Sequence, residues 1–336
     1  MTRISIVIPT RNRHASLTRL MFSLLSQRHT PDEVLVVDDS DDDETFKVVT
    51  EKGNIFLRKG ILLRYFHGNK ENRSISAARN LGAMKSTGEI VFFIDDDVIL
   101  DNEYIEEIMG TYEQYPMAKG VQGYICEGYK LPNFRSLLLN SVNKIFLLDH
   151  VEKNKCNYRL GLTYPYFPDS TIQCQWLHGT NMSLKKEVFQ SFCFDENLKR
   201  RSIGEDVDLT YRIYKHYPNS LFMNPRARLI HAKPAEGNKK DPAATQLLIY
   251  SSMAYLVYIF VKNYKQTIRN RLLFLWNLLG RIVEDCSLPL FISRDVKPFF
   301  WTVKSCISIA NHLDEVESGD FRFLDSLIQE KNICKR

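Results

Sequence analysis

The sequence predicts an α/β fold in which a mostly parallel sheet is flanked by helices, followed by a helical C-terminal region. Three observations support this prediction. Short apolar runs alternate with amphipathic stretches through the first part of the chain. Consecutive aspartates open two of the loops that follow the apolar runs. Beyond a polar segment containing Pro and Gly, the pattern becomes entirely helical, so a helical region is expected after the α/β part.

Four short runs are the expected strands of the sheet. They are rich in β-branched and aromatic residues and nearly continuous in apolar character, as parallel strands buried on both faces are. The runs are Ile4–Ile8, Glu33–Val37, Leu62–Phe66 and Ile90–Ile94. Between them, His14–Gln27 and Ser74–Ser86 place apolar side chains on one helical face, and Gly88 follows the second. Strands joined by helices imply right-handed crossovers, with ligands bound beyond the carboxyl ends of the strands.

The second part of the chain is less regular. Residues 130–170 are rich in aromatic side chains without a clean period, which predicts a variable loop region. The expected elements around it are a strand at Gly120–Ile125, a strand at Gln173–His178, a helix at Glu205–His216 and a strand at Leu221–Ile230 that ends at His231.

Composition excludes several functions. The net charge of +5 is mild, and no long run of Lys and Arg occurs, so nucleic acid is not an expected partner. The 7 cysteines are widely spaced without a CxxC pair, which argues against a disulfide framework or a zinc site and predicts reduced cysteines. The first apolar run is too short for a signal peptide, so a cytoplasmic location is expected.

Asp95-Asp96-Asp97 is the first candidate for chemistry, because it follows the run Ile90–Ile94 directly. Adjacent carboxylates repel one another unless a cation or solvent relieves them. Hard oxygen ligands at a strand end suit Mg²⁺ or Mn²⁺, which in turn bind phosphate oxygens. A solvated acidic turn is an equally simple interpretation. In an extended segment, Asp95 and Asp97 would point the same way and Asp96 the opposite way.

Three further candidates are weaker when taken singly. Asp38-Asp39 could cap the following helix, or accept hydrogen bonds from a nucleotide. Gly204-Glu205-Asp206 begins a helix, where the dipole favours a carboxylate, and an ionised carboxylate can act as a general base. His231 ends a strand, where it could be a metal ligand, although a lone His is more often structural.

The order of these motifs resembles family 2 glycosyltransferases. The resemblance covers about residues 3–231 and rests on six segments. They are Ser5-Ile6-Val7-Ile8-Pro9-Thr10-Arg11-Asn12, Val36-Val37-Asp38-Asp39-Ser40, Ala77-Ala78-Arg79-Asn80-Leu81-Gly82, Phe93-Ile94-Asp95-Asp96-Asp97, Gly179-Thr180-Asn181-Met182-Ser183 followed by Glu187-Val188-Phe189, and Gly204-Glu205-Asp206. This resemblance implies the GT-A fold, a Rossmann-like sheet, and an inverting, metal-dependent reaction.

The resemblance also implies a role for each matching residue. On the donor side, the residues implied to bind the nucleotide sugar are Pro9, Arg11, Asp38, Asp39, Arg79, Asp95 and Asp96. Asp97 and His231 are implied as metal ligands, and Asp206 as the catalytic base. On the acceptor side, the implied residues are Trp176, Asn181 and Glu205. Val98 stands where the family often has a fourth acid, which leaves open whether Asp96 or Asp97 faces the metal.

The implied activity is transfer of a sugar from a nucleotide diphosphate, with UDP favoured over dTDP and GDP, aided by Mn²⁺ or Mg²⁺. The implied acceptor is a hydroxyl of a glycan or of a lipid-linked sugar, in cell-surface polysaccharide synthesis. The alternatives are a non-catalytic sugar- or lipid-binding scaffold on the same fold and, less favoured, a sugar nucleotidyltransferase. The first loop lacks the glycines usual in nucleotidyltransferases.

The implied organisation has a catalytic domain at residues 1–231, a linker at 232–243 and a helical region at 244–336. The catalytic domain divides into a nucleotide-sugar half, residues 1–116, and an acceptor half, residues 117–231.

The helical region carries two opposed interpretations. The apolar stretch Leu247–Val261 is shorter than the roughly 20 residues that a membrane span needs. No acid occurs between Asp241 and Glu284, whereas this interval holds several aromatic residues and the cations Lys262, Lys265, Arg269, Arg271 and Arg281. Such a composition predicts a helix lying on an anionic membrane surface, which would make the protein peripheral on the cytoplasmic face. The alternative is a helical pair packed on the catalytic domain.

Overall fold

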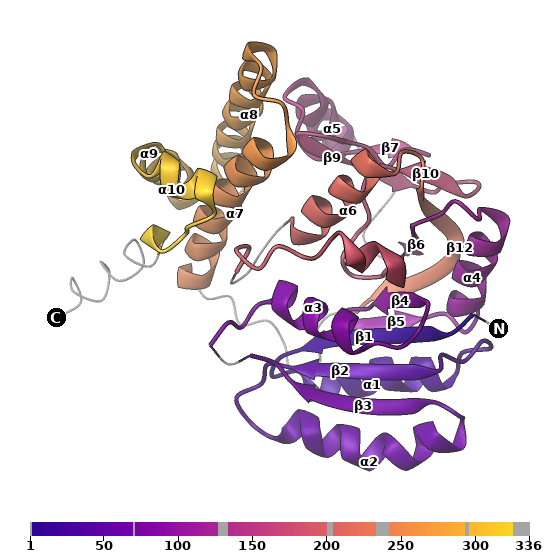
Figure 1. The fold of residues 1–336 in the computed structure, drawn as a ribbon. Coiled ribbons are helices and arrows are strands. Elements are labelled where there is room, and N and C mark those ends of the chain that lie inside the picture. Colours follow the sequence, from indigo (N-terminus) through magenta and orange to yellow (C-terminus); the bar gives the residue numbers. More distant parts are fainter. Residues whose placement is uncertain are drawn as a thin grey trace.

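The structure is a computed structural model that describes residues 2–69, 71–126, 134–199, 204–232, 242–292 and 296–324. The side chains of residues 134–135, 242–244 and 285–292 are not described. Its central element is a sheet flanked by helices, with a helical bundle above one edge (Figure 1). Within the described residues the sheet has nine strands in the order β10-β12-β6-β11-β4-β1-β2-β3, and β5 pairs with β12.

The N-terminal half of the sheet is parallel, as the sequence predicts. It consists of β1 (Ile4–Thr10), β2 (Glu33–Asp38), β3 (Leu62–His67) and β4 (Ile90–Phe93). β1 lies between β2 and β4, and β3 pairs with β2, always in parallel. β1, β2 and β4 are buried along their whole length, which explains why their sequences lack a polar face.

Helices α1 (His14–Leu25), α2 (Glu44–Arg58) and α3 (Ile75–Lys85) connect these strands. α3 begins where the Ser74 hydroxyl accepts a hydrogen bond from the Ala77 amide at 3.1 Å, an N-cap that satisfies one free amide of the first turn. Gly82 lets α3 approach β1 closely, since a Cβ at this position would lie 2.1 Å from a methyl of Val7.

The second half of the sheet is mixed. It contains β5 (Val98–Leu100), β6 (Gly120–Ile125), β10 (Ile172–Cys174), β11 (Met182–Lys185) and β12 (Leu221–His231). β11 joins the two halves because it runs antiparallel to both β4 and β6. The other elements here are α4 (Tyr104–Gln114), η1 (Lys186–Gln190) and α6 (Glu205–His216). The predicted bounds of the helix at 205–216 and of the strand ending at His231 are confirmed.

Two predictions for this half were wrong. The region expected to be a variable loop contains α5 (Phe134–Ile145) and a three-stranded sheet of β7 (His150–Lys153), β8 (Tyr158–Arg159) and β9 (Gly161–Tyr166). Asparagine side chains hold this unit together, as when Asn140 exchanges hydrogen bonds of 2.8 and 3.0 Å with the backbone of Val151. The expected strand at 173–178 stops at Cys174, and the chain turns afterwards.

The C-terminal region is helical where it is described: α7 (Pro242–Asn263), α8 (Ile268–Ile292), α9 (Lys297–Asn311) and α10 (Leu313–Ser318). α7 packs on the α/β part. Its Tyr258 hydroxyl donates to Asp195 at 2.6 Å, and Lys215 of α6 donates to the carbonyl and side chain of Asn263, both at 2.9 Å. One apolar cluster contains side chains of α6, α7, α9 and α10, so these helices share a core.

By length and composition, α7 is the one described helix that could cross a membrane. Its segment Thr245–Asn263 has a mean hydropathy of 1.2, but 56% of it is buried inside the protein. The apolar stretch Leu247–Val261 underestimated the length of this helix, which has 22 residues. Its burial is that of a core helix. Most of the predicted linker, residues 233–241, and the chain beyond residue 324 lie outside the described residues.

Candidate active site

The carboxyl ends of the parallel strands open into a cavity of about 600 Å³. Its lining comes from the end of β1 and the loop that follows it, the loops after β2 and β4, the start of α3, the end of β12 and one residue of α7. The lining residues are Pro9, Thr10, Arg11, Arg13, Asp39, Arg73, Ser74, Ile75, Ala78, Asp95, Asp96, Asp97, His231 and Leu247. Seven of the residues singled out by sequence are in this set: Pro9, Arg11, Asp39, Asp95, Asp96, Asp97 and His231.

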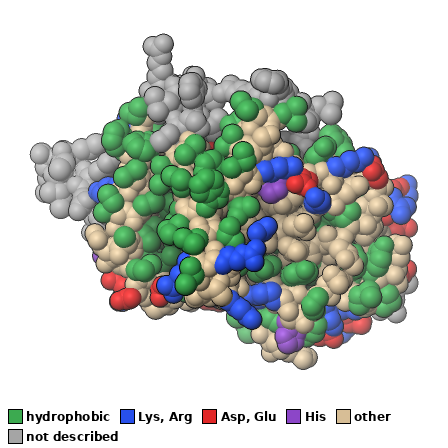
Figure 2. All heavy atoms as spheres, turned by 90° about the horizontal axis from the view of Figure 1, so that it is seen from above, with side chains coloured by type: hydrophobic (Ala, Val, Ile, Leu, Met, Phe, Trp, Pro, Cys, Tyr) green, Lys and Arg blue, Asp and Glu red, His purple; other side chains and the backbone are tan. Residues whose placement is uncertain are grey.

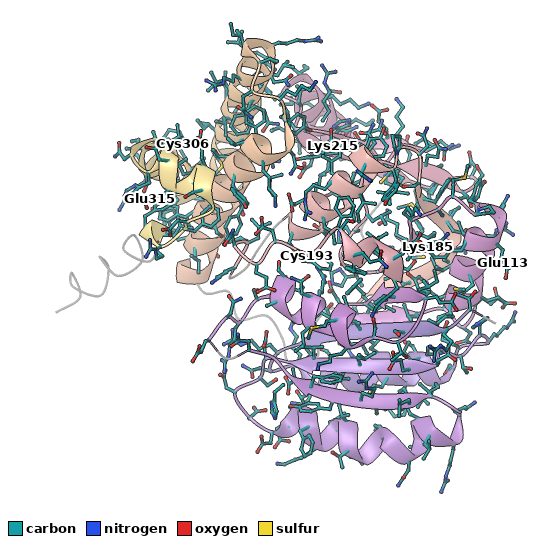
Figure 3. The ribbon with its side chains drawn as sticks, in the orientation of Figure 1. Glu113, Lys185, Cys193, Lys215, Cys306 and Glu315 are labelled. Carbon is teal, nitrogen blue, oxygen red and sulfur yellow. The ribbon has the colours of Figure 1, made fainter. Side chains whose placement is uncertain are left out.

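A larger cavity of about 1110 Å³ lies at the opposite ends of the strands, near Thr2 and Ile90. Glu113 and Lys185, which line it, lie on the right of Figure 3. None of the residues with an implied role in donor, metal or acceptor binding or in catalysis lines this cavity. Because ligands of parallel sheets bind at the carboxyl ends of the strands, the smaller cavity is the candidate site.

The three aspartates after β4 do not alternate as an extended segment would. β4 ends at Phe93, and Asp96 and Asp97 lie in a turn. The turn brings both carboxylates to one guanidinium, because Arg13 donates to Asp96 at 3.2 Å and to Asp97 at 2.9 Å. Asp95 instead accepts a hydrogen bond from Arg79 at 3.0 Å. The predicted pairing of Asp95 with Asp97 on one face is therefore wrong.

Asp96 is the most buried member of this turn. Its carboxylate accepts a hydrogen bond of 2.6 Å from the Thr10 hydroxyl, which ties the turn to the end of β1. Burial raises the pKa of Asp96 to about 7, although the Thr10 hydrogen bond and the charge of Arg13 oppose that rise. The Thr10 hydrogen bond gives Asp96 a structural role in the turn.

Asp97 is paired with His231. The register of β12 against β5 puts His231 beside Val98, and its Nε2 lies 3.0 Å from Asp97 Oδ1. The hydrogen bond to Asp97 raises the pKa of His231. Burial would raise the pKa of Asp97, but the hydrogen bond from His231 and the charges of His231 and Arg13 outweigh burial and lower it. The geometry therefore joins two residues that are 134 positions apart.

Asp97 and His231 alone are too few to hold a divalent metal, so phosphate oxygens of a bound substrate would have to complete its coordination. The described residues contain no group of three or more His, Cys, Asp or Glu side chains placed to hold an ion. Asp97 and His231 together supply one carboxylate and one imidazole. Mg²⁺ is commonly held in this way, by one or two protein carboxylates with substrate phosphates completing its shell.

The two aspartates at the end of β2, Asp38 and Asp39, have different environments. Asp38 is buried and accepts hydrogen bonds from the Ser40 amide at 2.9 Å and the Tyr65 hydroxyl at 2.8 Å, so it holds the turn. Asp39 lines the cavity, and burial raises its pKa against the opposing charges of Arg11 and Arg73. Asp39 is thus the one available to a ligand, whereas the expected nucleotide contact through Asp38 has no support in the geometry.

Asp206 is the second residue of α6. Its Oδ2 accepts a hydrogen bond of 2.6 Å from the Gly179 amide, and its Oδ1 accepts one of 2.8 Å from the Val207 amide. Its place in the first turn of the helix also favours the negative charge. Asp206 is partly exposed and is not among the lining residues of the 600 Å³ cavity. It lies near the Arg79 guanidinium, since a Cβ at Gly179 would be 3.1 Å from Asp206 and 2.9 Å from Arg79, and Arg79 in turn contacts Asp95.

Arg79 links the two halves of the site. Its buried guanidinium donates to Glu205 at 2.9 Å, to Asp95 at 3.0 Å and to the Gly179 carbonyl at 2.9 Å. Burial alone would lower the pKa of Arg79, but the charges of Asp95, Glu205 and Asp206 raise it. Arg79 is 1% exposed and does not line the cavity. Its hydrogen bonds hold the Asp95 loop and the start of α6 together.

The expected acceptor residues are also structural where they stand. Trp176 is 1% exposed and packs edge-on against Tyr164 at a ring distance of 5.1 Å. Asn181 is fully buried, and its side-chain oxygen accepts a hydrogen bond of 2.8 Å from the Gly123 amide. Glu205 is the buried partner of Arg79. These three residues shape the site without being exposed to an acceptor.

Sequence reasoning gave no role to several site residues. Arg13, Thr10 and Arg73 line the cavity, and Gly179 orients Asp206. Arg13 carried a usable signal, since it stands just after the loop that follows β1 and before the first helix. Gly179 begins one of the matching segments, but only the fold shows that a Cβ there would lie 2.9 Å from the Arg79 guanidinium.

Part of the chain is similar in sequence to known glycosyltransferases. Residues 5–168 match the profile described as "Glycosyl transferase family 2". The chain is 26% identical over 238 residues to the glucosyl-dolichyl phosphate glucuronosyltransferase of Haloferax volcanii, covering 68% of this chain and 69% of that protein. It is 28% identical over 231 residues to the validoxylamine A glucosyltransferase of Streptomyces hygroscopicus subsp. limoneus, covering 63% of this chain. The chain spans about half the length of that second relative, 48%.

Solved structures share the fold. Staphylococcus aureus TarS (residues 1–349) in complex with UDP-GlcNAc superposes with a TM-score of 0.57 at 14% identity, over 98% of this chain and 91% of that one. The mannosyltransferase PcManGT of Pyrobaculum calidifontis, in complex with GDP-Man and Mn²⁺, superposes with a TM-score of 0.54 at 14% identity, over 100% and 88%. Residues 5–168 therefore form a glycosyltransferase family 2 domain, and the fold of the chain is GT-A.

Proposed function

We propose that this protein transfers a sugar from a nucleotide diphosphate to a hydroxyl group with inversion at the anomeric carbon. The observation that carries the proposal is the convergence of Asp39, Asp95 and Asp97 on one cavity, with Asp206 one guanidinium away. UDP is the favoured nucleotide. The cavity, about 600 Å³, falls in the volume range of small-molecule sites, roughly 300–1,000 Å³.

The donor lies in the cavity between the loops after β1 and β2. Asp39 accepts hydrogen bonds from the base or ribose, because it is the carboxylate in this loop that faces the cavity. Arg11, Arg13 and Arg73 surround the same space and favour a diphosphate. Asp97 and His231 would hold a divalent metal, Mn²⁺ or Mg²⁺, which supplies charge stabilisation to the leaving diphosphate when bound.

Asp206 acts as the general base in this proposal. It takes the proton of the acceptor hydroxyl while the hydroxyl oxygen attacks the anomeric carbon from the face opposite the diphosphate. The new glycosidic bond forms as the bond to the diphosphate breaks, and the diphosphate leaves with the electron pair. The Gly179 amide fixes the carboxylate orientation through its 2.6 Å hydrogen bond. Base assistance of this kind contributes about 10²–10⁴-fold to the rate.

The acceptor is a glycan or a lipid-linked sugar, in the synthesis of cell-surface polysaccharide. The name of the Haloferax volcanii relative, glucosyl-dolichyl phosphate glucuronosyltransferase, supports the lipid-linked class. A cytoplasmic protein at the membrane face would meet both a nucleotide sugar and a lipid-linked acceptor.

Replacement of Asp206 tests this proposal. A thermal-shift screen of nucleotide sugars with and without Mn²⁺ first identifies the donor. We expect Asp206→Asn to bind that donor as the wild type does but to lose transfer by about 10²-fold or more, since the amide cannot take the proton. NMR of the product gives the anomeric configuration.

Near-normal turnover of Asp206→Asn would refute the base assignment, and a product with retained configuration would refute inversion. A wild-type protein that binds the donor with Mn²⁺ but neither hydrolyses nor transfers it would be a sugar-binding scaffold.

A further inference from the structure

One face of α8 exposes a continuous apolar stripe. Its members are between 43% and 80% exposed: Ile268, Leu272, Leu275, Trp276 and Leu279. They recur at intervals of three and four residues, which places them on the same side of the helix. Single exposed apolar residues need no explanation, but a contiguous group of this kind marks an interaction surface.

The stripe is held in place by the catalytic part of the chain. The Trp276 indole donates a hydrogen bond of 2.7 Å to the carbonyl of Ile145 at the end of α5. Its ring stacks on Phe146 at 4.8 Å, and Gly280 packs closely against the same phenylalanine. Ile145 is itself exposed and extends the patch. Figure 2, which views the molecule from above, shows hydrophobic side chains gathered on this face with Lys and Arg beside them.

Basic side chains flank the stripe. Arg269 and Arg271 are exposed and lie on opposite sides of it at 100° per residue, and Lys265 is exposed just before the helix. No ion pair joins these three cations to a residue in the described part of the chain. Only three of the five basic residues noted in the sequence are candidates for lipid contact. Lys262 pairs with Asp195 and Asp208, and Arg281 pairs with Asp149.

We propose that the α8 stripe docks on an anionic lipid surface, with its apolar side chains among the lipid headgroups and Lys265, Arg269 and Arg271 against the negative charges. A helix with an apolar face rimmed by basic residues binds in this orientation. A symmetric contact with a second copy is disfavoured, because it would bring two sets of like charges together. The docking surface lies outside the catalytic cavity, so the inference goes beyond the proposed reaction.

Vesicle co-sedimentation tests the docking surface without any donor or acceptor. Vesicles of phosphatidylcholine mixed with phosphatidylglycerol should bind the full chain, and vesicles of phosphatidylcholine alone should bind it much less. Arg269→Gln/Arg271→Gln should weaken binding about 30-fold, since each basic residue near an anionic surface contributes about fivefold. Leu272→Ser/Leu275→Ser should weaken it by about tenfold or more.

Leu57→Ser is the matched control, because Leu57 is an exposed leucine on α2 at the other end of the molecule (Figure 1). It should bind vesicles as the wild type does. The proposal would be overturned if the control and the stripe variants lost vesicle binding equally. It would also be overturned if neither pair of substitutions changed vesicle binding. A lipid-free dimer that the leucine substitutions dissociate would overturn it as well. Unchanged melting temperature and nucleotide affinity in the stripe variants separate a docking defect from misfolding or failure of the active site.

Discussion

At the scale of single residues, the site depends on side chains that do not touch the cavity. Arg79 is buried and contacts Asp95, Glu205 and Gly179, so it positions the turn at Asp95–Asp97 and the start of α6 relative to each other. The resemblance to the family implied that Arg79 would bind the donor, but burial gives it a positioning role. A sequence shows which residues carry charge, but it does not show which charges the fold encloses.

Arg79→Met should lower the free energy of unfolding by about 3–5 kcal/mol, because it leaves buried carboxylates without their partner. The control is Arg28→Met, which removes an exposed partner of Glu103 and should cost at most about 1 kcal/mol. Urea denaturation measures both. Equal losses in the two variants would show that the Arg79 network contributes no more than a surface ion pair.

At the scale of elements, the first half of the sheet was predictable and the second half was not. The N-terminal strands are buried on both faces, so their composition reveals them. In contrast, β7, β8 and β9 are between 2 and 6 residues long, and side chains such as Asn140 help to fix them. Such contacts join residues that are too far apart in the sequence for a helical or strand periodicity to reveal them. The turn at Asp96 was one of two interpretations of the sequence, because the pattern does not show whether strand alternation continues beyond the end of β4.

Gly68, in the loop after β3, lies close to the side chain of Asp39, the residue proposed to contact the nucleotide. A Cβ at Gly68 would lie 1.8 Å from Asp39 Oδ1, so Gly68→Ala must displace the Asp39 side chain. We expect this variant to lose about tenfold or more in nucleotide affinity, measured by calorimetry, because one or more hydrogen bonds to the ligand are lost. Gly53→Ala is the control, since a Cβ there has open space and an alanine favours helix α2. Normal affinity in Gly68→Ala would show that Asp39 does not contact the nucleotide.

At the scale of the whole molecule, one buried carboxylate ties the sheet together. Glu33 on β2 accepts hydrogen bonds from Ser5 on β1 at 2.6 Å, from Thr87 before β4 at 2.6 and 2.9 Å, and from Arg64 on β3 at 2.8 Å. Burial would raise the pKa of Glu33, but these hydrogen bonds together lower it below the ordinary 4.5.

A lowered pKa in the folded state predicts how stability depends on pH. The contribution of Glu33 is fully present above pH 4.5, the value expected in the unfolded chain, and is lost as the pH falls through the lower folded pKa. Glu33→Gln should therefore cost about 2–3 kcal/mol at neutral pH, and less as the pH drops below that value. Urea denaturation at a series of pH values measures the difference. A gap between wild type and variant that stays constant in acid would contradict this account.

The arrangement of the whole chain was only partly readable from its sequence. The GT-A fold and the cavity at the strand ends follow from strand order and loop motifs. The packing of α7 against α6 does not, because an apolar helix is compatible with a core, a membrane span or a surface. Tyr258 and Lys262 of α7 both contact Asp195 in the structure, which places this helix against the catalytic part.

A calorimetric titration of UDP, GDP and dTDP, with and without Mn²⁺, tests most directly whether the carboxylates converge on one nucleotide-sugar site. The proteins compared are the wild type, Asp39→Ala, Asp97→Ala and Asp206→Asn. We expect one nucleotide to bind the wild type more tightly with Mn²⁺, and Asp97→Ala to lose that gain. Asp39→Ala should weaken binding with or without the metal, while Asp206→Asn binds normally. Binding of none of the three nucleotides, or equal affinity in all four proteins, would contradict the shared site.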